Sequence, residues 1–503
     1  MGVLNQVALA LLDPFTLLLI VAGTGLGVFF GAVPGLSGAI GVALLVPVTF
    51  TLSPQNGLLM LGGIYMGSHY GGAISAILLN APGDVVAACT AIEGYPMSKQ
   101  GRAKEALYTA ILSCVVGGFV GVLVLILFTP LLARFALQFG PAEMFLVAVA
   151  GLVVTGTLAA RNVTKGLFGV IFGIALSTVG VDPMSGADRL VFGFTPLKAG
   201  ISLIPVILGL FAIAEILTNS GGQTGQIAET SAKPTSIATV MRYMLKKWLL
   251  LSKSTLLGTF IGVVPGTGGA VATFISYAEA KRTSKDSGSF GQGNPEGIIA
   301  AESANNGAVG GSLVPLLALG IPGSATSAIM YGAITIHGLI AGPRLFSDHP
   351  VVAYSFMYGM LLTVIIMGII GIAGIPLFSL IVKVKLKYLS PIVLAVCMFG
   401  AFSVNNRLFD VLVAIVFGGV GILFRKTNIP PATVVLGLIL GPIVERNFRR
   451  VLTIAGARSI SPLRYVLSSP LSLGILVVVV LLLVSFFRLN RLSRQQEVAS
   501  VDE

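Results

Sequence analysis

Long apolar runs constrain this chain more than any other feature of its sequence. TLLLIVAGTGLGVFF, ILSCVVGGFVGVLVLILF and LSLGILVVVVLLLVSFF approach the length of about 20 helical residues that crosses a bilayer. Only 10% of the 503 residues are charged, and the mean hydropathy is +0.97, whereas an average soluble protein carries about 25% charged residues. Because backbone groups cannot stay unpaired in lipid, these runs predict an all-α polytopic membrane protein with roughly 12 to 16 crossing or half-crossing segments.

Signatures of enzymes and of nucleic-acid binding are absent from the sequence. There is no Gly-Lys dipeptide and hence no Walker A loop, no GxSxG elbow, and the three histidines form no HExxH. Cys89, Cys114 and Cys397 lie far apart in apolar surroundings, so we expect them to pack as small apolar residues. The basic residues are scattered over loops, which is typical of cytoplasmic loops rather than of a nucleic-acid surface. We therefore expect neither an enzyme nor a nucleic-acid partner.

A Pro-Gly motif occurs twice inside the apolar pattern and predicts interrupted helices. GAVPGLSGA spans residues 31–39 and GVVPGTGGA spans residues 262–270. Each is followed by a second Pro-Gly pair, in LLNAPGD and in LALGIPGS. Proline removes a backbone donor and clashes with the preceding turn, and glycine permits backbone angles closed to other residues. The pairs therefore predict four helix breaks at membrane depth, where broken backbone is tolerated only inside protein or along a cavity.

Three glycines precede the first of these breaks at a spacing of four residues. They are Gly23, Gly27 and Gly31 in GTGLGVFFG. Because small residues at this spacing let two helix backbones approach closely, we interpret them as a packing face.

Loop charges indicate that the two copies have opposite orientations. The first copy's inner loop, TLSPQN, has no basic residue, and its counterpart carries Lys281, Arg282 and Lys285. After the second Pro-Gly pair the bias reverses, with three basic residues in SKQGRAK against Arg344 alone. Since basic loops stay in the cytoplasm, equivalent loops lie on opposite sides of the membrane. This pattern predicts inverted-topology repeats with helical hairpins.

The polar segment between the copies sets the predicted domain boundaries. We expect a first membrane repeat over residues 1–220, a cytoplasmic linker over 221–252, an inverted second repeat over 253–465, and a C-terminal membrane helix with a cytoplasmic tail over 466–503. The tail, RLNRLSRQQEVASVDE, is basic close to the last span, which places it in the cytoplasm. The basic end of the linker, residues 242–247, is either an amphipathic helix on the membrane surface or a solvated loop.

The breaks themselves are the predicted substrate site. A broken helix exposes N-terminal amides, which attract anions, and C-terminal carbonyls, which coordinate cations. The alternative for the hydroxyl residues is helix capping or back-bonding. We expect the substrate-binding residues to be Gly35, Ser37, Gly38, Asn80, Pro82, Gly83, Gly266, Thr267, Gly268, Pro322, Gly323, Ser324 and Thr326.

A coupling cation is predicted from the polar residues beside the breaks. Asp84 follows a Pro-Gly pair directly, and a carboxylate there would repel an anionic substrate but hold a sodium ion or a proton. Side-chain oxygens of Asn80, Asn305 and Asn306 suit the same cation. The alternatives are an N-cap for Asp84 and interhelical hydrogen bonds for the asparagines. His69 is either a proton relay or a packing residue, and we expect Glu302, one turn before the asparagines, to face a cytoplasmic vestibule.

These motifs resemble the large membrane subunit of the tripartite tricarboxylate transporter family. The resemblance rests on GAVPGLSG, LLNAPGDVVAACTAIEGYPMSKQGRAKEAL, GVVPGTGGAVATFISY and LALGIPGSATSAIMYGAITIHGLIAGPRLF, and it extends from about Pro14 to beyond Val444. It implies secondary uptake of citrate or a related dicarboxylate or aromatic carboxylate, driven by a sodium or proton gradient across the bacterial cytoplasmic membrane. It also implies a small membrane subunit, a periplasmic solute-binding protein and an elevator-like arrangement. The alternative is an uncoupled carboxylate channel, which would not accumulate substrate.

Overall fold

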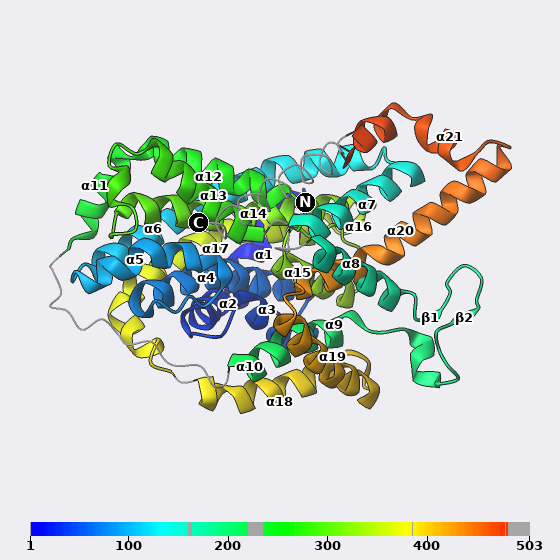
Figure 1. Ribbon diagram of the computed structural model, residues 1–503, viewed down its shortest axis with the longest axis horizontal. Helices are drawn as coiled ribbons and strands as arrows, with labels where there is room; N and C mark the ends of the chain where they lie inside the picture. Colours follow the sequence, from blue (N-terminus) through cyan, green and yellow to red (C-terminus); the bar gives the residue numbers. More distant parts are fainter. Residues whose placement is uncertain are drawn as a thin grey trace, which may run out of the picture. The chain divides into compact units, whose positions relative to one another are not determined.

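The computed structural model describes residues 2–158, 163–219, 235–266, 268–384, 386–477 and 479–480, and it is built almost entirely of helices (Figure 1). The all-α prediction is therefore confirmed. Up to the first long crossing helix, the elements are α1 Val3–Leu12, α2 Pro14–Ala32, α3 Gly38–Leu45, η1 Pro47–Thr51, α4 Pro54–Leu79, η2 Val85–Ala87, α5 Ala88–Lys99 and α6 Ala103–Ala136. The next elements are α7 Pro141–Leu158, α8 Val163–Ser177, β1 Gly180–Val181, β2 Asp188–Arg189, η3 Thr195–Ala199, α9 Leu203–Ile207, the π-helix η4 Leu208–Ile213 and α10 Ala214–Asn219.

The second half of the chain opens with a short helix and repeats an order of elements seen in the first half. The elements are α11 Ile237–Lys246, α12 Trp248–Val263, α13 Gly268–Thr283, η5 Ser287–Ser289, α14 Pro295–Leu319, α15 Ala325–Ile336, α16 Pro343–Asp348, α17 Pro350–Ile381, α18 Leu386–Asn405, α19 Leu408–Lys426, α20 Pro431–Ala457 and α21 Pro462–Leu467. In both halves, a helix, a break, another helix, a long helix, a break and a short helix follow one another. The order is α2, α3, α4, α5 in the first half and α12, α13, α14, α15 in the second.

Helices long and apolar enough to cross a membrane make this chain a multi-pass membrane protein. Five such helices occur in the described part of the chain, at Pro14–Ala32, Ala103–Ala136, Pro350–Ile381, Tyr388–Asn405 and Leu408–Lys426, and seven shorter apolar segments accompany them. The long helices α4 and α14 carry more glycine and polar residues, and nearly all of their residues are buried inside the protein. They are the central helices of the fold rather than its lipid-facing ones.

The helices begin where the local sequence provides a cap. Asp13 accepts a hydrogen bond from the amide of Thr16 at 2.9 Å, and Pro14 occupies the first helical position of α2. Ser53 with Pro54 starts α4, and Asn294 with Pro295 starts α14 in the same way. A short polar side chain supplies an acceptor to an otherwise unpaired amide, and proline has no amide to leave unpaired there.

All four Pro-Gly pairs interrupt helices, as predicted. The first break, residues 33–37, separates α2 from α3, and the second, residues 80–84, separates α4 from η2 and α5. The third lies between Val263 and Gly268, and the fourth, residues 320–324, separates α14 from α15. The chain turns through left-handed backbone angles at each one, with φ of 83° at Gly35, 54° at Asn80, 77° at Gly266 and 73° at Gly320.

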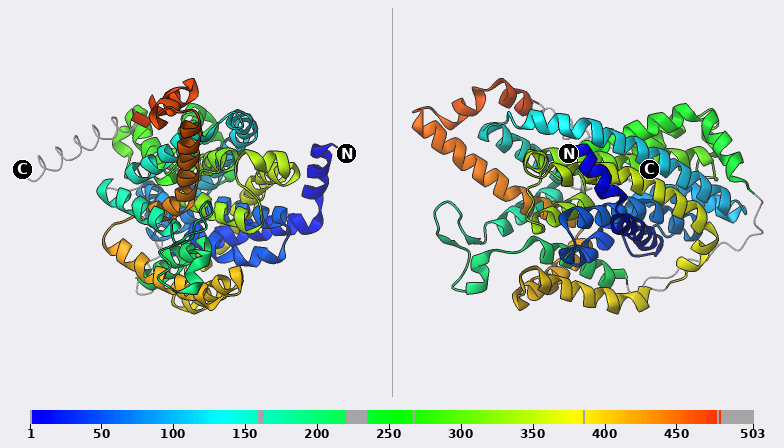
Figure 2. Two further views of the ribbon diagram at one scale, coloured as in Figure 1. Left: turned by 90° about the vertical axis from the view of Figure 1, so that its right-hand side faces the viewer. Right: turned by 180° about the vertical axis from the view of Figure 1, so that it is seen from behind.

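Glycine faces bring the paired helices into backbone contact on each side of the breaks. A Cβ atom placed at Gly23, Gly27 or Gly31 of α2 would lie 2.2–2.4 Å from a backbone oxygen of α4. A Cβ atom at Gly258 or Gly262 of α12 would lie equally close to a backbone oxygen of α14, at 2.2 and 2.5 Å. The packing interpretation of the glycine spacing is therefore confirmed, and α2 and α4 lie side by side in Figures 1 and 2.

The chain divides into two compact units, each made of two segments. The larger comprises Met1–Arg134 and Ser202–Lys426 and contains all four breaks, and the smaller comprises Phe135–Ile201 and Thr427–Glu503. Within the smaller unit, α20 packs on α7 and α8, and Arg449 joins Asp182 at 2.7 Å beside the short β1–β2 hairpin. These units are defined by which residues contact one another, and they do not show whether one half of the chain repeats the other. The predicted repeat boundaries therefore stay a prediction.

The linker and the C-terminus are described only in part. The basic end of the linker forms the helix α11, with Val240 and Met244 packed on Ile299 of α14, so the solvated-loop alternative is wrong. Residues 221–234 of the linker and residues 481–503 lie outside the described residues, and the end of the predicted C-terminal membrane helix and the whole predicted cytoplasmic tail fall in the second of these ranges.

Candidate functional site

The first break presents a capped helix start. Gly35 takes a left-handed angle that other residues adopt rarely, and Ser37 caps α3 by accepting from the amide of Ile40 at 3.4 Å. Gly38 leaves room for Ser68 of α4, whose hydroxyl oxygen would lie 2.1 Å from a Cβ atom there. The Ser37 hydroxyl also donates toward a carboxylate oxygen of Glu215 on α10, at 3.5 Å. Ser37 therefore caps α3, as the alternative interpretation expected, and it also contacts the carboxylate of Glu215.

The second break places a carboxylate beside an imidazole. Asn80 closes α4 in a left-handed conformation, and a Cβ atom at Gly83 would lie 2.1 Å from the backbone oxygen of Gly31. Asp84 then stands at the start of η2. The amides of Val85 and Val86 face its carboxylate without a capping bond of standard geometry, and His69 of α4 is close enough to interact with its charge.

The third break faces the second across the two halves of the chain. Gly268 opens α13 with a φ of 63° and has open space where a side chain would project. A Cβ atom on the next residue, Gly269, would lie 3.2 Å from Val86 and 3.5 Å from Cε1 of His69. Thr267 lies outside the described residues. The N-terminus of α13 therefore lies next to His69 and the second break.

The fourth break is held to the third and to α4. The Gly266 amide donates to the Gly323 oxygen at 3.0 Å. Ser324 and Ser327 form a reciprocal capping box at the start of α15, where Thr326 is buried as well. The Ser324 hydroxyl also lies 2.8 Å from the hydroxyl of Tyr65, so its hydrogen bonds in this structure are those of a cap and of an interhelical contact.

A chain of hydrogen-bonded polar side chains extends from the partly buried His69 at the second break to the fully buried Glu302. Nδ1 of His69 lies 2.5 Å from Oδ1 of Asn305, and Nδ2 of Asn305 donates to Glu302 at 3.2 Å. Glu302 also accepts from the hydroxyl of Thr90 and from the thiol of Cys114, the latter at 3.1 Å. The Glu302 side chain is completely buried, and no basic side chain in the described part of the chain lies within 4.0 Å of it.

The expectation that Glu302 faces a vestibule is therefore wrong in this conformation. Glu302, Asn305 and Asn306 are three and four residues apart, which places them on one face of α14. That face points into the protein because α14 is packed by α12, α13 and α5. In the sequence, the spacing of three and four residues from Glu302 to the two asparagines already indicates that the three side chains share a helix face.

The hydrogen bonds of Glu302 fix the orientation of the next two groups. A carboxylate accepts only, so the amide nitrogen of Asn305 must face Glu302 and its oxygen must face His69. Nδ1 of His69 must then carry a proton and donate it to that oxygen. In the neutral ring Nε2 is left as an acceptor, and the adjacent ring atom Cε1 would lie 3.5 Å from a Cβ atom at Gly269.

Asn306 is fully buried, and among the residues that the structure describes, neither polar atom of its amide has a hydrogen-bond partner of standard geometry. An unsatisfied amide inside a protein costs about 1–3 kcal/mol per group. The thiol of Cys114 lies next to it, and that thiol contacts Glu302. The amide oxygen is thus an unused acceptor near the buried carboxylate of Glu302. Carboxylate and amide oxygens together are suitable ligands for a small cation.

An ion pair beside the first break was not predicted. Arg425 of α19 donates to Glu215 of α10 at 3.0 Å, and Glu215 is the partner of Ser37. The Nε atom of Arg425 is buried and has no hydrogen-bond partner among the described residues. Because Glu215 and Arg425 are far apart in sequence, no local motif predicts their ion pair. The pair forms because α10 and α19 pack beside the first break.

Comparisons with known proteins agree with the resemblance noted in the motifs. Residues 17–436 match the model of the tripartite tricarboxylate transporter TctA family. A protein of Agrobacterium vitis described as an "Uncharacterized 52.8 kDa protein in TAR-I ttuC' 3'region" is 36% identical over 481 residues, 94% of each chain. A second from the same organism, an "Uncharacterized protein in TAR-II ttuC' 3'region", is 33% identical over 229 residues, 45% of this chain and 95% of its own. No solved structure matches.

Proposed function

The chain belongs to the tripartite tricarboxylate transporter TctA family, and we propose that it takes up carboxylates by secondary active transport coupled to a cation gradient. The substrate is citrate or a related dicarboxylate or aromatic carboxylate. A periplasmic solute-binding protein delivers it, and a small membrane subunit completes the transporter in the bacterial cytoplasmic membrane. The coupling ion is Na⁺ or H⁺, and the chain performs no enzymatic step.

The observation that carries the coupling proposal is the hydrogen-bonded chain that runs from His69 through Asn305 to the fully buried Glu302. Ionisable groups in a membrane interior are costly and mark ion or proton pathways. Here a fully buried carboxylate is connected through one asparagine to an imidazole, and that imidazole lies beside the carboxylate of Asp84. Asp84 and Glu302, with oxygens from Asn80, Asn305 and Asn306, are the groups that take up the cation.

The helix starts at the breaks are the proposed carboxylate site. Gly268 and Gly269 open α13 toward His69, and backbone amides at a helix N-terminus attract anions. Ser37 at the start of α3 and Ser324 at the start of α15 add hydroxyls, once their capping bonds are exchanged for substrate. The cation held by Asp84 and Glu302 then offsets the repulsion between substrate and protein carboxylates.

We propose that the two halves are inverted repeats and that transport moves the broken helices as an elevator-like domain. Support comes from the matching order of elements and from the glycine contacts of α2 with α4 and of α12 with α14. Opposite loop charges support the inversion.

Transport into proteoliposomes tests the proposal. The vesicles contain this chain with its small subunit, and labelled citrate is supplied with the cognate binding protein under an inward Na⁺ gradient, an inward H⁺ gradient or neither. We expect accumulation above equilibrium with one of the two gradients. Equilibration alone under both gradients would establish the uncoupled channel instead.

The variant Glu302→Gln separates coupling from folding. Glutamine keeps the size and an acceptor, but it cannot bind a proton and carries no charge for a cation. We expect the variant to exchange internal for external substrate while it loses gradient-driven accumulation. The matched control is Glu93→Gln, at a second fully buried glutamate, whose partners are Tyr277 and the amides of residues 291, 293 and 294. Equal loss of accumulation in both variants would show that Glu302 has no specific role in coupling.

A further inference from the structure

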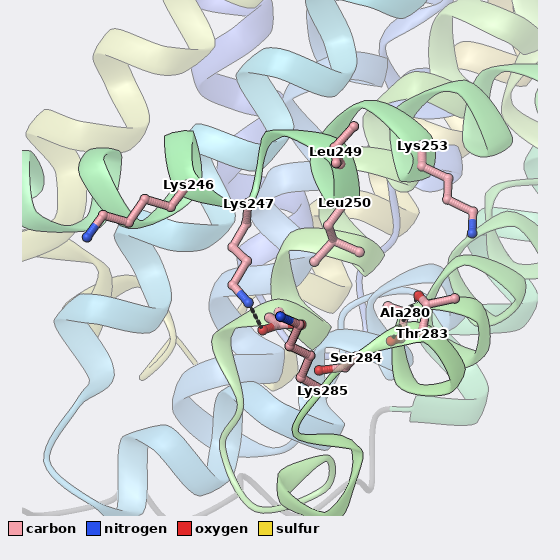
Figure 3. A pocket seen from close by; sticks show the side chains of 10 residues that line it. Lys246, Lys247, Leu249, Leu250, Lys253, Ala280, Thr283, Ser284 and Lys285 are labelled. Carbon is pink, nitrogen blue, oxygen red and sulfur yellow. Dashed lines mark hydrogen bonds and ion pairs between the residues drawn. The ribbon is translucent and has the colours of Figure 1, made fainter.

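A basic pocket lies in the larger unit, away from the breaks, where α11 meets α12. It has a volume of about 400 Å³, and its walls come from the end of α11, the start of α12, the end of α13 and the start of α14. Figure 3 shows the side chains of Lys247 and Lys253 pointing toward the space between these helices, with Lys285 across from Lys247. Lys246 lies at the end of α11 that adjoins α12, and its side chain is directed away from Lys247.

The lining of the pocket carries an excess of positive charge. Four lysines face a single carboxylate, that of Glu296. Lys247 pairs with Glu296 at 2.5 Å, and Lys253 pairs with Glu279. In the described part of the chain, Lys246 and Lys285 have no acidic side chain within 4.0 Å. Two ammonium groups are thus left for an anion, and the hydroxyl of Ser284 lies in the same wall.

Exposed apolar residues show which kind of surface surrounds the pocket. The outer side of α11 and the first turn of α12 expose Met241, Leu245, Trp248 and Leu249, at 46–67% of their full accessible area. The opposite side of α11 buries Val240 and Met244. A helix with a basic polar side, exposed apolar residues and a terminal tryptophan is typical of the membrane interface. Since α12 is an apolar helix that starts here, the pocket opens at the level of the lipid headgroups.

We propose that this pocket binds the phosphate headgroup of an anionic phospholipid of the cytoplasmic leaflet. Lys285 contacts the phosphate, the exposed side chain of Lys246 turns inward to contact it as well, and Leu249 contacts the start of the acyl chains. Basic pockets between membrane helices on the cytoplasmic side are suited to such headgroups. The bound lipid would join α11 and α13 to the start of α14 through the Lys247–Glu296 pair, and it would therefore stabilise the helix that carries Glu302.

Lipid binding to the purified full-length chain tests the proposal. The chain is delipidated in detergent and titrated with phosphatidylglycerol, phosphatidylcholine or inorganic phosphate, and native mass spectrometry reports bound lipid. We expect retention of phosphatidylglycerol only. The variant Lys246→Gln/Lys285→Gln should weaken this binding about thirty-fold, the effect of removing two basic residues near an anionic surface. The matched control Lys281→Gln/Lys383→Gln removes the same charge from exposed positions outside the pocket and should leave binding unchanged.

Three results would overturn the assignment. Equal retention of phosphatidylcholine would mean that only apolar contacts hold the lipid. Displacement of phosphatidylglycerol by millimolar inorganic phosphate would make this a site for a soluble anion. Equal weakening in both double variants would mean that net charge alone attracts the lipid. If the double variant does not fold, each single lysine variant is compared with the wild-type chain in the same titration.

Discussion

The contact between α2 and α4 can be tested with one methyl group. In Gly27→Ala, the new Cβ would lie 2.4 Å from the backbone oxygen of Ile64, and real Cβ contacts essentially never fall below 3.0 Å. The helices must therefore separate by at least the difference, 0.6 Å. Because Gly23 and Gly31 make the same contact one turn away on each side, the displacement also loosens their packing. Overpacking of this kind costs about 1–3 kcal/mol.

The matched control is Gly25→Ala on the same helix. There the nearest atom to the new Cβ is Cδ1 of Ile370 at 3.9 Å, which is an ordinary contact. Both variants gain about 0.5–1 kcal/mol from replacing a helical glycine, so this gain cancels in the comparison. The two variants should therefore differ by the overpacking cost alone, and Gly27→Ala should be the less stable.

The native cysteines provide the assay for this comparison. Cys89, Cys114 and Cys397 are free and buried, so a thiol-reactive fluorophore reports unfolding in detergent without added labels. Gly25→Ala should melt at or above the wild-type temperature and Gly27→Ala a few degrees below it. Equal melting temperatures for the two variants would refute the backbone contact.

Three further predictions use the same melting assay or a local probe. Ser324→Ala removes the capping box of α15 and should cost about 1 kcal/mol, seen as a lower melting temperature, whereas an unchanged value would mean that the cap carries no stability. Glu93→Ala leaves the buried amides of Gly293 and Asn294 without an acceptor, at about 1–3 kcal/mol each, so residues 284–294 should become sensitive to protease unless another group replaces the carboxylate. At Asp182, hydrogen bonds from Met184 and Ser185 and the Arg449 guanidinium hold the pKa of the carboxyl below its ordinary range. A depressed pKa contributes stability above the ordinary carboxyl pKa of about 3.9 that is lost as the pH falls below it. The protection factor of the β1–β2 hairpin, which compares its amide exchange with that of an unfolded chain at the same pH, should therefore fall below about pH 4 in the wild type, and this fall should be smaller in Asp182→Asn, which lacks the carboxyl.

Much of the fold could be predicted because its signals are local. Hydropathy gives the helices, the Pro-Gly pairs give the four breaks, and the glycine spacing gives the contact face of α2. Each of these depends on a few neighbouring residues and on the absence of water in the bilayer. The assembly of the compact units depends instead on contacts between distant helices, which is why neither unit follows the order of the chain.

The candidate site was predictable only where polar residues share a helix or a break. Asp84, Asn305 and Asn306 stand out as polar residues in apolar surroundings. The link from Asn305 to His69, and the position of Arg425 near Ser37, require α14 to pack on α4 and α19 to pack near α3. Contacts between residues that are 200 or more positions apart leave no periodic pattern in the sequence. They could therefore not be predicted from residue spacing.

The charges around the breaks argue for coupling rather than for a simple anion pore. In the part of the chain that the structure describes, the carboxylates of Asp84, Glu215 and Glu302 stand near the breaks, and the guanidinium beside the first break, that of Arg425, is already paired with Glu215. Anion-selective pores instead use arginine or lysine at their constrictions. Two like charges about 4 Å apart repel by ~4 kcal/mol at an effective dielectric constant near 20, which corresponds to a population change of about a thousand-fold. Under the proposed function, a carboxylate substrate would therefore need a proton or a cation on Asp84 or Glu302 before it could stay beside them, and that requirement would couple the two movements.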